Sequence, residues 1–261
     1  MKNTGLKGKK VLITGASSGL GFAMAKALGN AGASVIITAR GGDKLNKALN
    51  SLQSAQIDAY ALQMDVRSEQ SIQETVSWVK EQWGRLDLLV NNAGIGMRTV
   101  NPAFLTDAQP FFKVSASGFR DLIDINLTGY FLVAKAFAPL FIEQGKGKIV
   151  NISMNHETMK RKGFIPYGPS RAGAESLSII MAEDLKAYHI DVNMLLPGGA
   201  TETGMIPDEF KAEIKGKIQL LSPDIMGEPI VFLSSDESNG ITGERITATS
   251  FESWKAELST K

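Results

Sequence analysis

Three glycines follow the first apolar run of the chain at a spacing that suits phosphate binding. They lie in the sequence TGASSGLG at positions 14–21, between a predicted strand and a predicted helix. Glycine permits a tight turn and close approach of a diphosphate, and the first helical turn offers free N–H groups and a partial positive charge. The spacing departs from the general G-x-G-x-x-G pattern, so the prediction depends on the strand–turn–helix context. The predicted phosphate-binding residues are Gly15, Ser17, Ser18, Gly19, Leu20 and Gly21.

A basic residue ends the second predicted strand, where dinucleotide-binding folds commonly carry an acidic one. The sequence there reads ITAR, and Arg40 lies about 20 residues beyond the glycine loop. An acid at this place binds the ribose 2′-hydroxyl, whereas an arginine fork suits a 2′-phosphate through charge-assisted bidentate hydrogen bonds. The sequence therefore favours NADP(H). NAD(H) stays open as the alternative, as does a solvated arginine that binds no cofactor.

Short apolar runs alternate with longer helical patterns along the chain. The runs VLIT, SVIIT and LDLLV are almost entirely apolar, which is typical of strands covered on both faces. The predicted strands are Lys10–Thr14, Ser34–Thr38, Asp58–Met64, Leu86–Asn91, Lys148–Ser153, Asp191–Leu196 and Ile246–Thr249. The predicted helices are Gly19–Ala31, Lys44–Ser54, Ser68–Trp83, Ser115–Gln144, Gly168–Tyr188 and Pro223–Ser234.

This alternation predicts an α/β fold with a doubly wound parallel sheet. Strands that alternate with helices of this length form βαβ units, whose crossovers are right-handed. The sequence has no linker rich in proline, glycine or serine, no charge block and no low-complexity tract. We therefore expect residues 1–261 to form a single nucleotide-binding domain.

Composition excludes several classes of function. The 28 Lys and Arg residues nearly balance the 27 Asp and Glu residues, which argues against a nucleic-acid binder. The chain has no cysteine, which excludes disulfides, thiolate zinc sites and cysteine nucleophiles, and its two histidines argue against a metal site. The N-terminal apolar stretch is too short for a signal peptide, and no window approaches the roughly 18 apolar residues of a membrane span. We expect a cytoplasmic protein with no metal and no membrane partner.

Four motifs occur in an order that resembles the short-chain dehydrogenase/reductase family. They are TGASSGLG at 14–21, the quartet Asn91-Asn92-Ala93-Gly94, Tyr167, and the pair Pro197-Gly198. The resemblance extends from Gly8 to about Thr249. It implies a Rossmann fold whose mostly parallel seven-stranded sheet has helices on both faces. It also implies a nicotinamide cofactor, hydride transfer between a carbonyl and an alcohol, and a homodimer or homotetramer.

The same resemblance assigns roles to individual residues. Tyr167 exchanges the proton of the substrate hydroxyl, and Asn126 holds a water in a proton relay. Thr203 resembles the threonine near the nicotinamide carboxamide, but one extra residue precedes it, so Thr201 also stands as a candidate. Met205 and Ile206 fall where the family carries a lid over the substrate. Further cofactor contacts are implied for Asp65, Val66, Asn92, Ala93, Gly94, Tyr167, Arg171, Pro197 and Gly198.

Two catalytic positions depart from the family pattern. Arg171 stands four residues after Tyr167, where lysine is usual; it keeps a positive charge on the same helix face but is a poor proton relay. Met154 stands at the usual serine position, and a thioether donates no hydrogen bond. Ser153 and Asn155 are the candidate replacements for that hydroxyl, and a site with no replacement is the third alternative.

These departures leave three functions in competition. The favoured one is an NADP(H)-dependent carbonyl reductase or alcohol dehydrogenase that acts on a small molecule, with Tyr167 as acid and base. The second is a cofactor-binding protein with weak or no catalysis. The third is an atypical lyase or epimerase of the same fold. The stretch from Met97 to Gly118, which is longer than in most relatives, could shape the substrate pocket or an oligomer contact.

Overall fold

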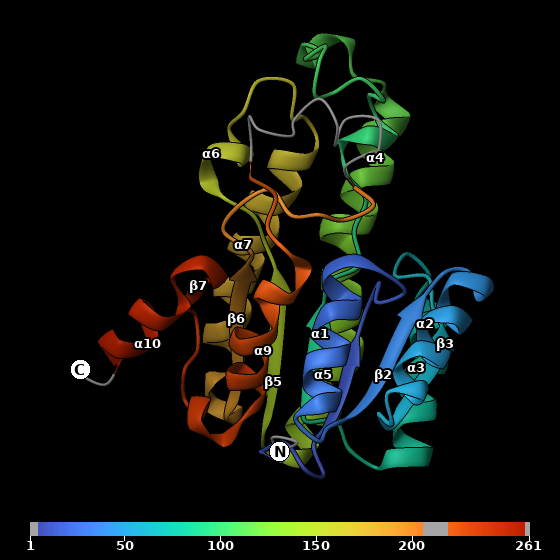
Figure 1. Ribbon diagram of the computed structural model, residues 1–261, viewed down its shortest axis with the longest axis vertical. Helices are drawn as coiled ribbons and strands as arrows, with labels where there is room; N and C mark the ends of the chain where they lie inside the picture. Colours follow the sequence, from blue (N-terminus) through green and yellow to red (C-terminus); the bar gives the residue numbers. More distant parts are fainter. Residues whose placement is uncertain (1–4, 206–218, 259–261) are drawn as a thin grey trace.

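Seven parallel strands form one sheet in the order β3-β2-β1-β4-β5-β6-β7 in the computed structural model, which describes residues 5–205 and 219–258 (Figure 1). Each predicted strand corresponds to an observed one, with small differences at its ends, so the predicted doubly wound sheet is confirmed. The strands are β1 (Lys10–Ile13), β2 (Ser34–Ala39), β3 (Ala59–Gln63), β4 (Leu88–Asn91), β5 (Gly147–Ile152), β6 (Ile190–Leu196) and β7 (Arg245–Thr247).

Helices cover both faces of this sheet. On one face, apolar side chains of α1 (Gly19–Asn30), α2 (Gly42–Ser54), α9 (Gly227–Ser234) and α10 (Phe251–Leu258) join a single buried cluster. On the other face, α3 (Glu69–Trp83), α5 (Gly129–Gln144) and α7 (Tyr167–Leu185) form a second cluster. Because both faces of the sheet are buried, most strand side chains are apolar, as in VLI of β1 and VII of β2. The strands β5 and β6 also carry buried polar side chains, among them Asn151 and Asn193.

The order of the strands reverses next to β1, which pairs with β2 on one side and β4 on the other. The two crossovers that leave β1 and β4 therefore run to opposite sides, and a crevice opens at the carboxyl ends of these strands. Just below this crevice β1 and β4 are still paired, since the amide of Thr14 donates to the carbonyl of Val90 at 2.9 Å. Ligands of doubly wound sheets bind in this crevice, so the topology sets the place of the site.

Two short helices rise above the carboxyl edge of the sheet (Figure 1). They are α4 (Ala116–Ile123) and α6 (His156–Met159). The stretch before α4, drawn in green at the top of Figure 1, packs on the loop before α7. The rings of Phe104 and Phe164 pack edge to face, with 5.9 Å between their centroids. A Cβ at Gly163 would lie 3.0 Å from Ala108. This stretch thus borders the site on the side of Tyr167.

The helix predicted over Ser115–Gln144 consists of three segments. A π-helical turn, Asp124–Thr128, separates α4 from α5. Such turns often lie at functional sites. A π-helical turn holds one residue more than an α-helical turn, which changes the direction of nearby side chains. The sequence analysis missed this turn, and it missed α6 and α10, whose four and eight residues are too short for a periodic pattern.

The stretch Ala116–Gln144 also corrects the expectation about membrane spans. It is 29 residues long with a mean hydropathy of 1.5 in its most apolar 18-residue window, which is apolar and long enough to cross a bilayer. Half of that window is buried in the fold, where α5 packs on α3, β4 and β5. A helix at the core of a globular protein meets the same criterion, because its apolar side faces the sheet.

Candidate active site

The glycine loop and the loop after β4 are joined by hydrogen bonds. The Nδ2 atom of Asn92 donates to the carbonyls of Thr14, at 2.9 Å, and Gly15, at 3.0 Å. Gly15 has a φ of +64°, and a Cβ there would lie 2.6 Å from the Cα of Ala93. A Cβ at Gly21 would lie 2.5 Å from the same Asn92 nitrogen. Both glycines are therefore needed for these loops to approach each other, which leaves the backbone open above them.

The first turn of α1 directs its N–H groups to the crevice. Ser18 is the N-cap residue, and its side chain makes no capping hydrogen bond within the described part of the chain. The amides that open the helix at Gly19, Leu20 and Gly21 have no partner within the helix itself, as in every α-helix. Ser17 is half-buried and Ser18 exposed. This turn has the donors and the dipole that a diphosphate needs.

Arg40 lies exposed just beyond β2, at the opposite end of the crevice from α7. Its backbone carbonyl accepts a hydrogen bond from the Gln63 side chain at 2.9 Å. Hydrogen bonds from Arg67 hold the pKa of Asp65 below its usual range, and the charge of Arg40 lowers that pKa further. Val66, the next residue, is buried against Gly129. The Arg40 fork is thus near the Asp65 carboxylate but is not engaged by an ion pair among residues 5–205 and 219–258.

Tyr167 and Arg171 begin α7, one helical turn apart. The guanidinium carbon of Arg171 lies 5.3 Å from the centroid of the Tyr167 ring. The Arg171 side chain is buried, whereas Tyr167 is half-buried. The Tyr167 hydroxyl lies 3.9 Å from the thioether of Met205 and also interacts with the Arg171 side chain. A buried cation therefore lies beside both the ring and the hydroxyl of Tyr167. Such a cation stabilises negative charge on the tyrosine oxygen.

The Arg171 guanidinium is fixed by two acceptors. Its Nη1 atom donates to the hydroxyl of Tyr130 at 2.7 Å and to the carbonyl of Ile152 at 2.9 Å. Burial on its own would lower the pKa of Arg171, but the interactions with Tyr130 and Tyr167 outweigh it and raise that pKa above its ordinary value. Arg171 is therefore a permanent cation and cannot pass on a proton.

The other edge of the guanidinium faces the loop after β4. A Cβ at Gly94 would lie 2.6 Å from Nη2 of Arg171 and 3.2 Å from Oδ1 of Asn126, so only glycine leaves room there. The Nε atom of Arg171 is buried and has no hydrogen-bond partner in the part of the chain that the structure describes. A ribose hydroxyl is the kind of group that a buried, unpaired N–H at this place would bind.

Asn126 holds the loop that follows Gly94. It lies in the π-helical turn and is fully buried. Its Oδ1 accepts from the amide of Ile95 and its Nδ2 donates to the carbonyl of Ile95, both at 2.9 Å. The Asn126 side chain thus fixes the backbone of this loop through two hydrogen bonds.

The two candidates for the missing serine differ in their partners. The Ser153 hydroxyl donates to Oε1 of Glu175 at 2.5 Å, so its proton is already committed. The Asn155 amide donates one N–H to the carbonyl of Gly198 at 3.0 Å. Its second N–H has no acceptor among the described residues. Asn155 therefore keeps a free donor next to Gly198, whereas Ser153 does not.

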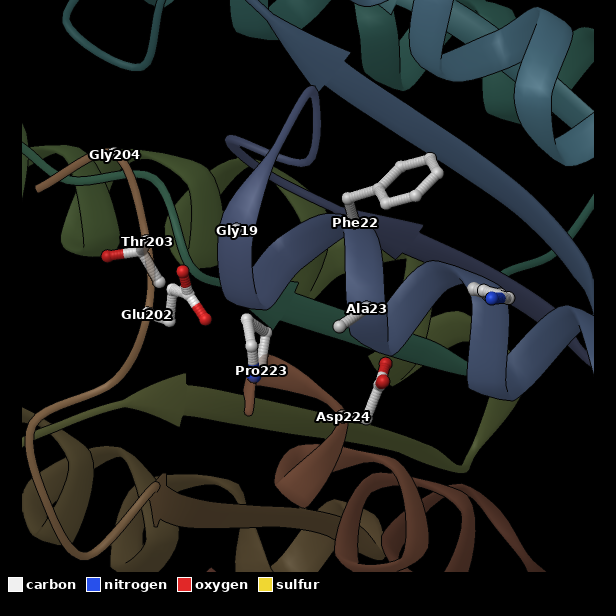
Figure 2. Close-up of a pocket in the computed structure, with 9 residues that line it drawn as sticks. Gly19, Phe22, Ala23, Glu202, Thr203, Gly204, Pro223 and Asp224 are labelled. Carbon is white, nitrogen blue, oxygen red and sulfur yellow. The ribbon is translucent and has the colours of Figure 1, made fainter. Parts of the chain in front are cut away.

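Thr203 lies beside the first turn of α1. A groove lies between α1 and the segments 202–204 and 223–224. Gly19 lines it on the side of α1, and Thr203 lines it on the other side (Figure 2). A Cβ at Gly19 would lie 3.4 Å from the methyl group of Thr203. Thr201 is buried and donates to the carbonyl of Gly199 at 3.2 Å. Of the two threonines, Thr203 is the one that lies at the glycine loop.

Pro197 and Gly198 follow β6 at the same edge of the sheet. Gly198 has a φ of +96° and lies too close to Thr249 to allow a side chain. The expected lid residue Met205 lies against Gly96 and the Tyr167 hydroxyl, while Ile206 lies outside the described residues.

Sequence reasoning missed three residues that hold the site together. Tyr130 lies four residues after Asn126 in the continuous helical stretch, and Glu175 lies four after Arg171, so helical spacing could have suggested both. Arg245 at the start of β7 donates to Glu175 at 2.8 Å and to the carbonyl of Met154 at 2.7 Å. No local pattern indicates that contact, since the residues lie far apart in the sequence.

Comparison with known proteins agrees with this geometry. A family model described as short chain dehydrogenase matches residues 9–214. A 2-dehydro-3-deoxy-D-gluconate 5-dehydrogenase of Formosa agariphila is 29% identical over 247 residues, which cover 91% of this chain and 90% of the relative. A 3-oxoacyl-acyl-carrier-protein reductase of Thermotoga maritima is 34% identical over 250 residues, covering 92% and 96%.

Solved structures share the whole fold. A gluconate 5-dehydrogenase of Burkholderia cenocepacia, crystallised with NADP and tartrate, superimposes with a TM-score of 0.81 at 26% identity. The similarity covers 97% of this chain and 98% of that protein. The likeness therefore includes the glycine loop, the strand order and α7.

Proposed function

Since the chain belongs to the short-chain dehydrogenase family, we propose that it transfers a hydride between NADP(H) and a small carbonyl or alcohol substrate, with Tyr167 as the acid and base. One observation carries this proposal: the buried Arg171 cation links the Tyr167 ring, at 5.3 Å, to the Gly94 backbone of the predicted cofactor crevice. Catalysis and cofactor binding thus share one charged group. The solved relative with bound NADP supports the choice of a nicotinamide cofactor.

The cofactor fits the groups that the crevice offers. The backbone amides of Gly19 to Gly21 would bind the diphosphate, and Arg40 would bind a 2′-phosphate. Arg171, with its unpaired Nε, would bind the nicotinamide ribose. When bound, the reduced nicotinamide supplies the hydride that the carbonyl carbon accepts.

Tyr167 supplies the proton in the direction of reduction. Its hydroxyl gives a proton to the substrate oxygen while that oxygen gains charge from the arriving hydride, so a carbonyl becomes an alcohol. Arg171 stabilises the phenolate that remains, because the guanidinium keeps its charge throughout. Since Tyr167 is only half-buried, the phenolate recovers a proton from solvent. Alcohol oxidation runs through the same steps in reverse.

We further propose that Asn155 takes the place of the missing serine. Its second N–H is free for the substrate oxygen, whereas the Ser153 proton is held by Glu175. We expect Asn155→Ala to lower kcat/KM for reduction by about 100-fold, as removal of an oxyanion donor does. The measurement is steady-state kinetics of Asn155→Ala and Ser153→Ala side by side.

Ser153→Ala is the matched control, because it removes a polar group from the same loop, two residues before Asn155. A loss with Ser153→Ala as large as that with Asn155→Ala would contradict the assignment. Equal Tm values for the two variants would show that the comparison is not affected by folding.

The Ser153–Glu175 hydrogen bond also favours a second candidate function, a cofactor-binding protein with weak or no catalysis. The two candidates are separated by titrating the purified protein with NADPH and NADH at equal ionic strength, then testing a panel of carbonyl compounds. We expect tighter binding of NADPH and turnover of at least one carbonyl. Tight NADPH binding without any turnover would support the second candidate. Binding of neither nucleotide would contradict both.

We also propose a homodimer or homotetramer in the cytoplasm. The outer faces of α5 and α7 carry large apolar side chains that are exposed in the single chain, among them Phe131 at 45% and Ile180 at 56%. Apolar patches of this kind commonly lie at subunit contacts. Light scattering of the purified protein measures the mass of the particle, which should be two or four times the 28.1 kDa of one chain.

A further inference from the structure

We propose that Tyr130 is a positioning residue that holds the Arg171 guanidinium beside Tyr167, an inference that rests on the proposed function. Tyr130 belongs to α5 and is buried in the fold. Its hydroxyl accepts from Nη1 of Arg171 at 2.7 Å and donates to the carbonyl of Ile152 at 3.3 Å. Arg171 and Tyr130 therefore share one acceptor at the end of β5.

This arrangement fixes the direction of the guanidinium fork. Nη1 has two N–H groups, and Tyr130 and Ile152 accept both of them. The guanidinium carbon lies 5.5 Å from the Tyr130 ring and 5.3 Å from the Tyr167 ring, so both aromatic faces attract the cation. With Nη1 anchored, Nη2 faces Gly94 and Nε stays unpaired. Nη2 is therefore the donor that stays on the side of Gly94 in the cofactor crevice.

A neutral hydroxyl suits this role better than a carboxylate would. Burial raises the pKa of Tyr130, and Arg171 offsets only part of that effect. Tyr130 therefore accepts a hydrogen bond without adding a negative charge. The full charge of Arg171 stays available to Tyr167, whereas a carboxylate partner would cancel much of it.

The guanidinium needs such an anchor because arginine is long and its charge is spread. A lysine ammonium is a compact point charge with rotating donors, while the planar fork must be oriented to present a given edge. We infer that the arginine at 171 and the tyrosine at 130 act as a unit. Changing either residue alone should then remove most of the stabilisation that the pair gives to the Tyr167 phenolate.

The test is a titration of phenolate absorbance that does not depend on turnover. The step that Tyr167→Phe removes identifies Tyr167 in the unchanged protein. We expect Tyr130→Phe to move this step to higher pH by about one pH unit, because the cation is no longer held beside Tyr167. In the double variant Tyr130→Phe/Arg171→Lys, the step should lie close to that of Arg171→Lys alone.

Ser178→Ala is the control for simple loss of a buried hydroxyl. That hydroxyl lies on α7 and bonds to Asn151, at 2.8 Å, and to the carbonyl of Ala174. We expect Ser178→Ala to lower Tm and leave the Tyr167 step in place. An unmoved step in Tyr130→Phe, or an equal movement in Ser178→Ala, would overturn the positioning role.

Kinetics supply an independent readout once a substrate is known. Tyr130→Phe should lower kcat for alcohol oxidation at neutral pH by about tenfold, the effect of one hydrogen bond to a charged group. The midpoint of the pH–rate profile should move with the phenolate step, and the Kd for NADPH should change less than kcat does. If the unchanged protein turns over no substrate, the proposed function fails, while the titration still decides the role of Tyr130.

Discussion

Tyr167→Phe is expected to lower the rate of carbonyl reduction by about 1,000-fold, because the hydroxyl that gives the proton to the substrate oxygen is lost. The ring remains and can still contact Arg171, whose guanidinium carbon lies 5.3 Å from the ring centroid. The fold should be preserved, since Tyr167 is half-buried and its hydrogen bond to the Met205 thioether, at 3.9 Å, is a weak one. NADPH binding should change little. The measurement is single-turnover reduction of a saturating carbonyl substrate, together with the Kd for NADPH.

Tyr188→Phe is the matched control for this variant. Tyr188 follows α7 in a short 3-10 helix and is 45% exposed. Tyr188→Phe therefore removes the same kind of hydroxyl at a place far from the crevice. Its activity should equal that of the unchanged protein. Normal turnover by Tyr167→Phe would show that another group transfers the proton, and the assignment of Tyr167 would be wrong.

Arg40→Glu is expected to weaken NADPH binding by about 100-fold or more, because a charge-assisted pair is replaced by repulsion between like charges. Binding of NADH, which has no 2′-phosphate, should weaken far less. The preference for NADPH should therefore disappear or reverse. The difference is best measured by fluorescence titration at low ionic strength, since Arg40 is exposed and salt screens its field.

Lys47→Glu provides the same change of charge on the exposed side of α2. It should leave the ratio of the two Kd values unchanged. An equal loss for NADPH and NADH in Arg40→Glu would instead indicate general repulsion. In that case the 2′-phosphate would have to be bound elsewhere, with Arg67 as the next cation along this edge of the sheet.

The fold could be predicted from the sequence because each signal is local. Runs such as VLIT and SVIIT are apolar on both faces, and that pattern alone identifies strands buried on both sides. Gly15 and Gly21 mark the crevice because a Cβ at either would collide with the loop after β4. The position of Tyr167 relative to Arg171 follows from helical spacing, since residues four apart share a face.

The contacts that decide the chemistry could not be predicted in the same way. Whether Ser153 faces the substrate depends on Glu175 of α7, which accepts hydrogen bonds from Ser153 and from Arg245 of β7. The direction of the Arg171 fork depends on Tyr130 across the interface between α5 and α7. These are pairings between elements distant in the chain, and no periodic pattern encodes which side chains meet. The π-helical turn at Asn126 likewise escapes a search for regular periods.

The most direct test of the central claim is the fate of deuterium from NADPH deuterated at the transferring position of the nicotinamide. The protein would be incubated with this cofactor and a panel of sugar keto acids, 3-oxoacyl thioesters and simple ketones, and the products analysed by mass spectrometry. The account predicts an alcohol that carries deuterium at the former carbonyl carbon, formed by the unchanged protein and not by Tyr167→Phe. Saturating binding of NADPH with no deuterated alcohol from any member of the panel would contradict it.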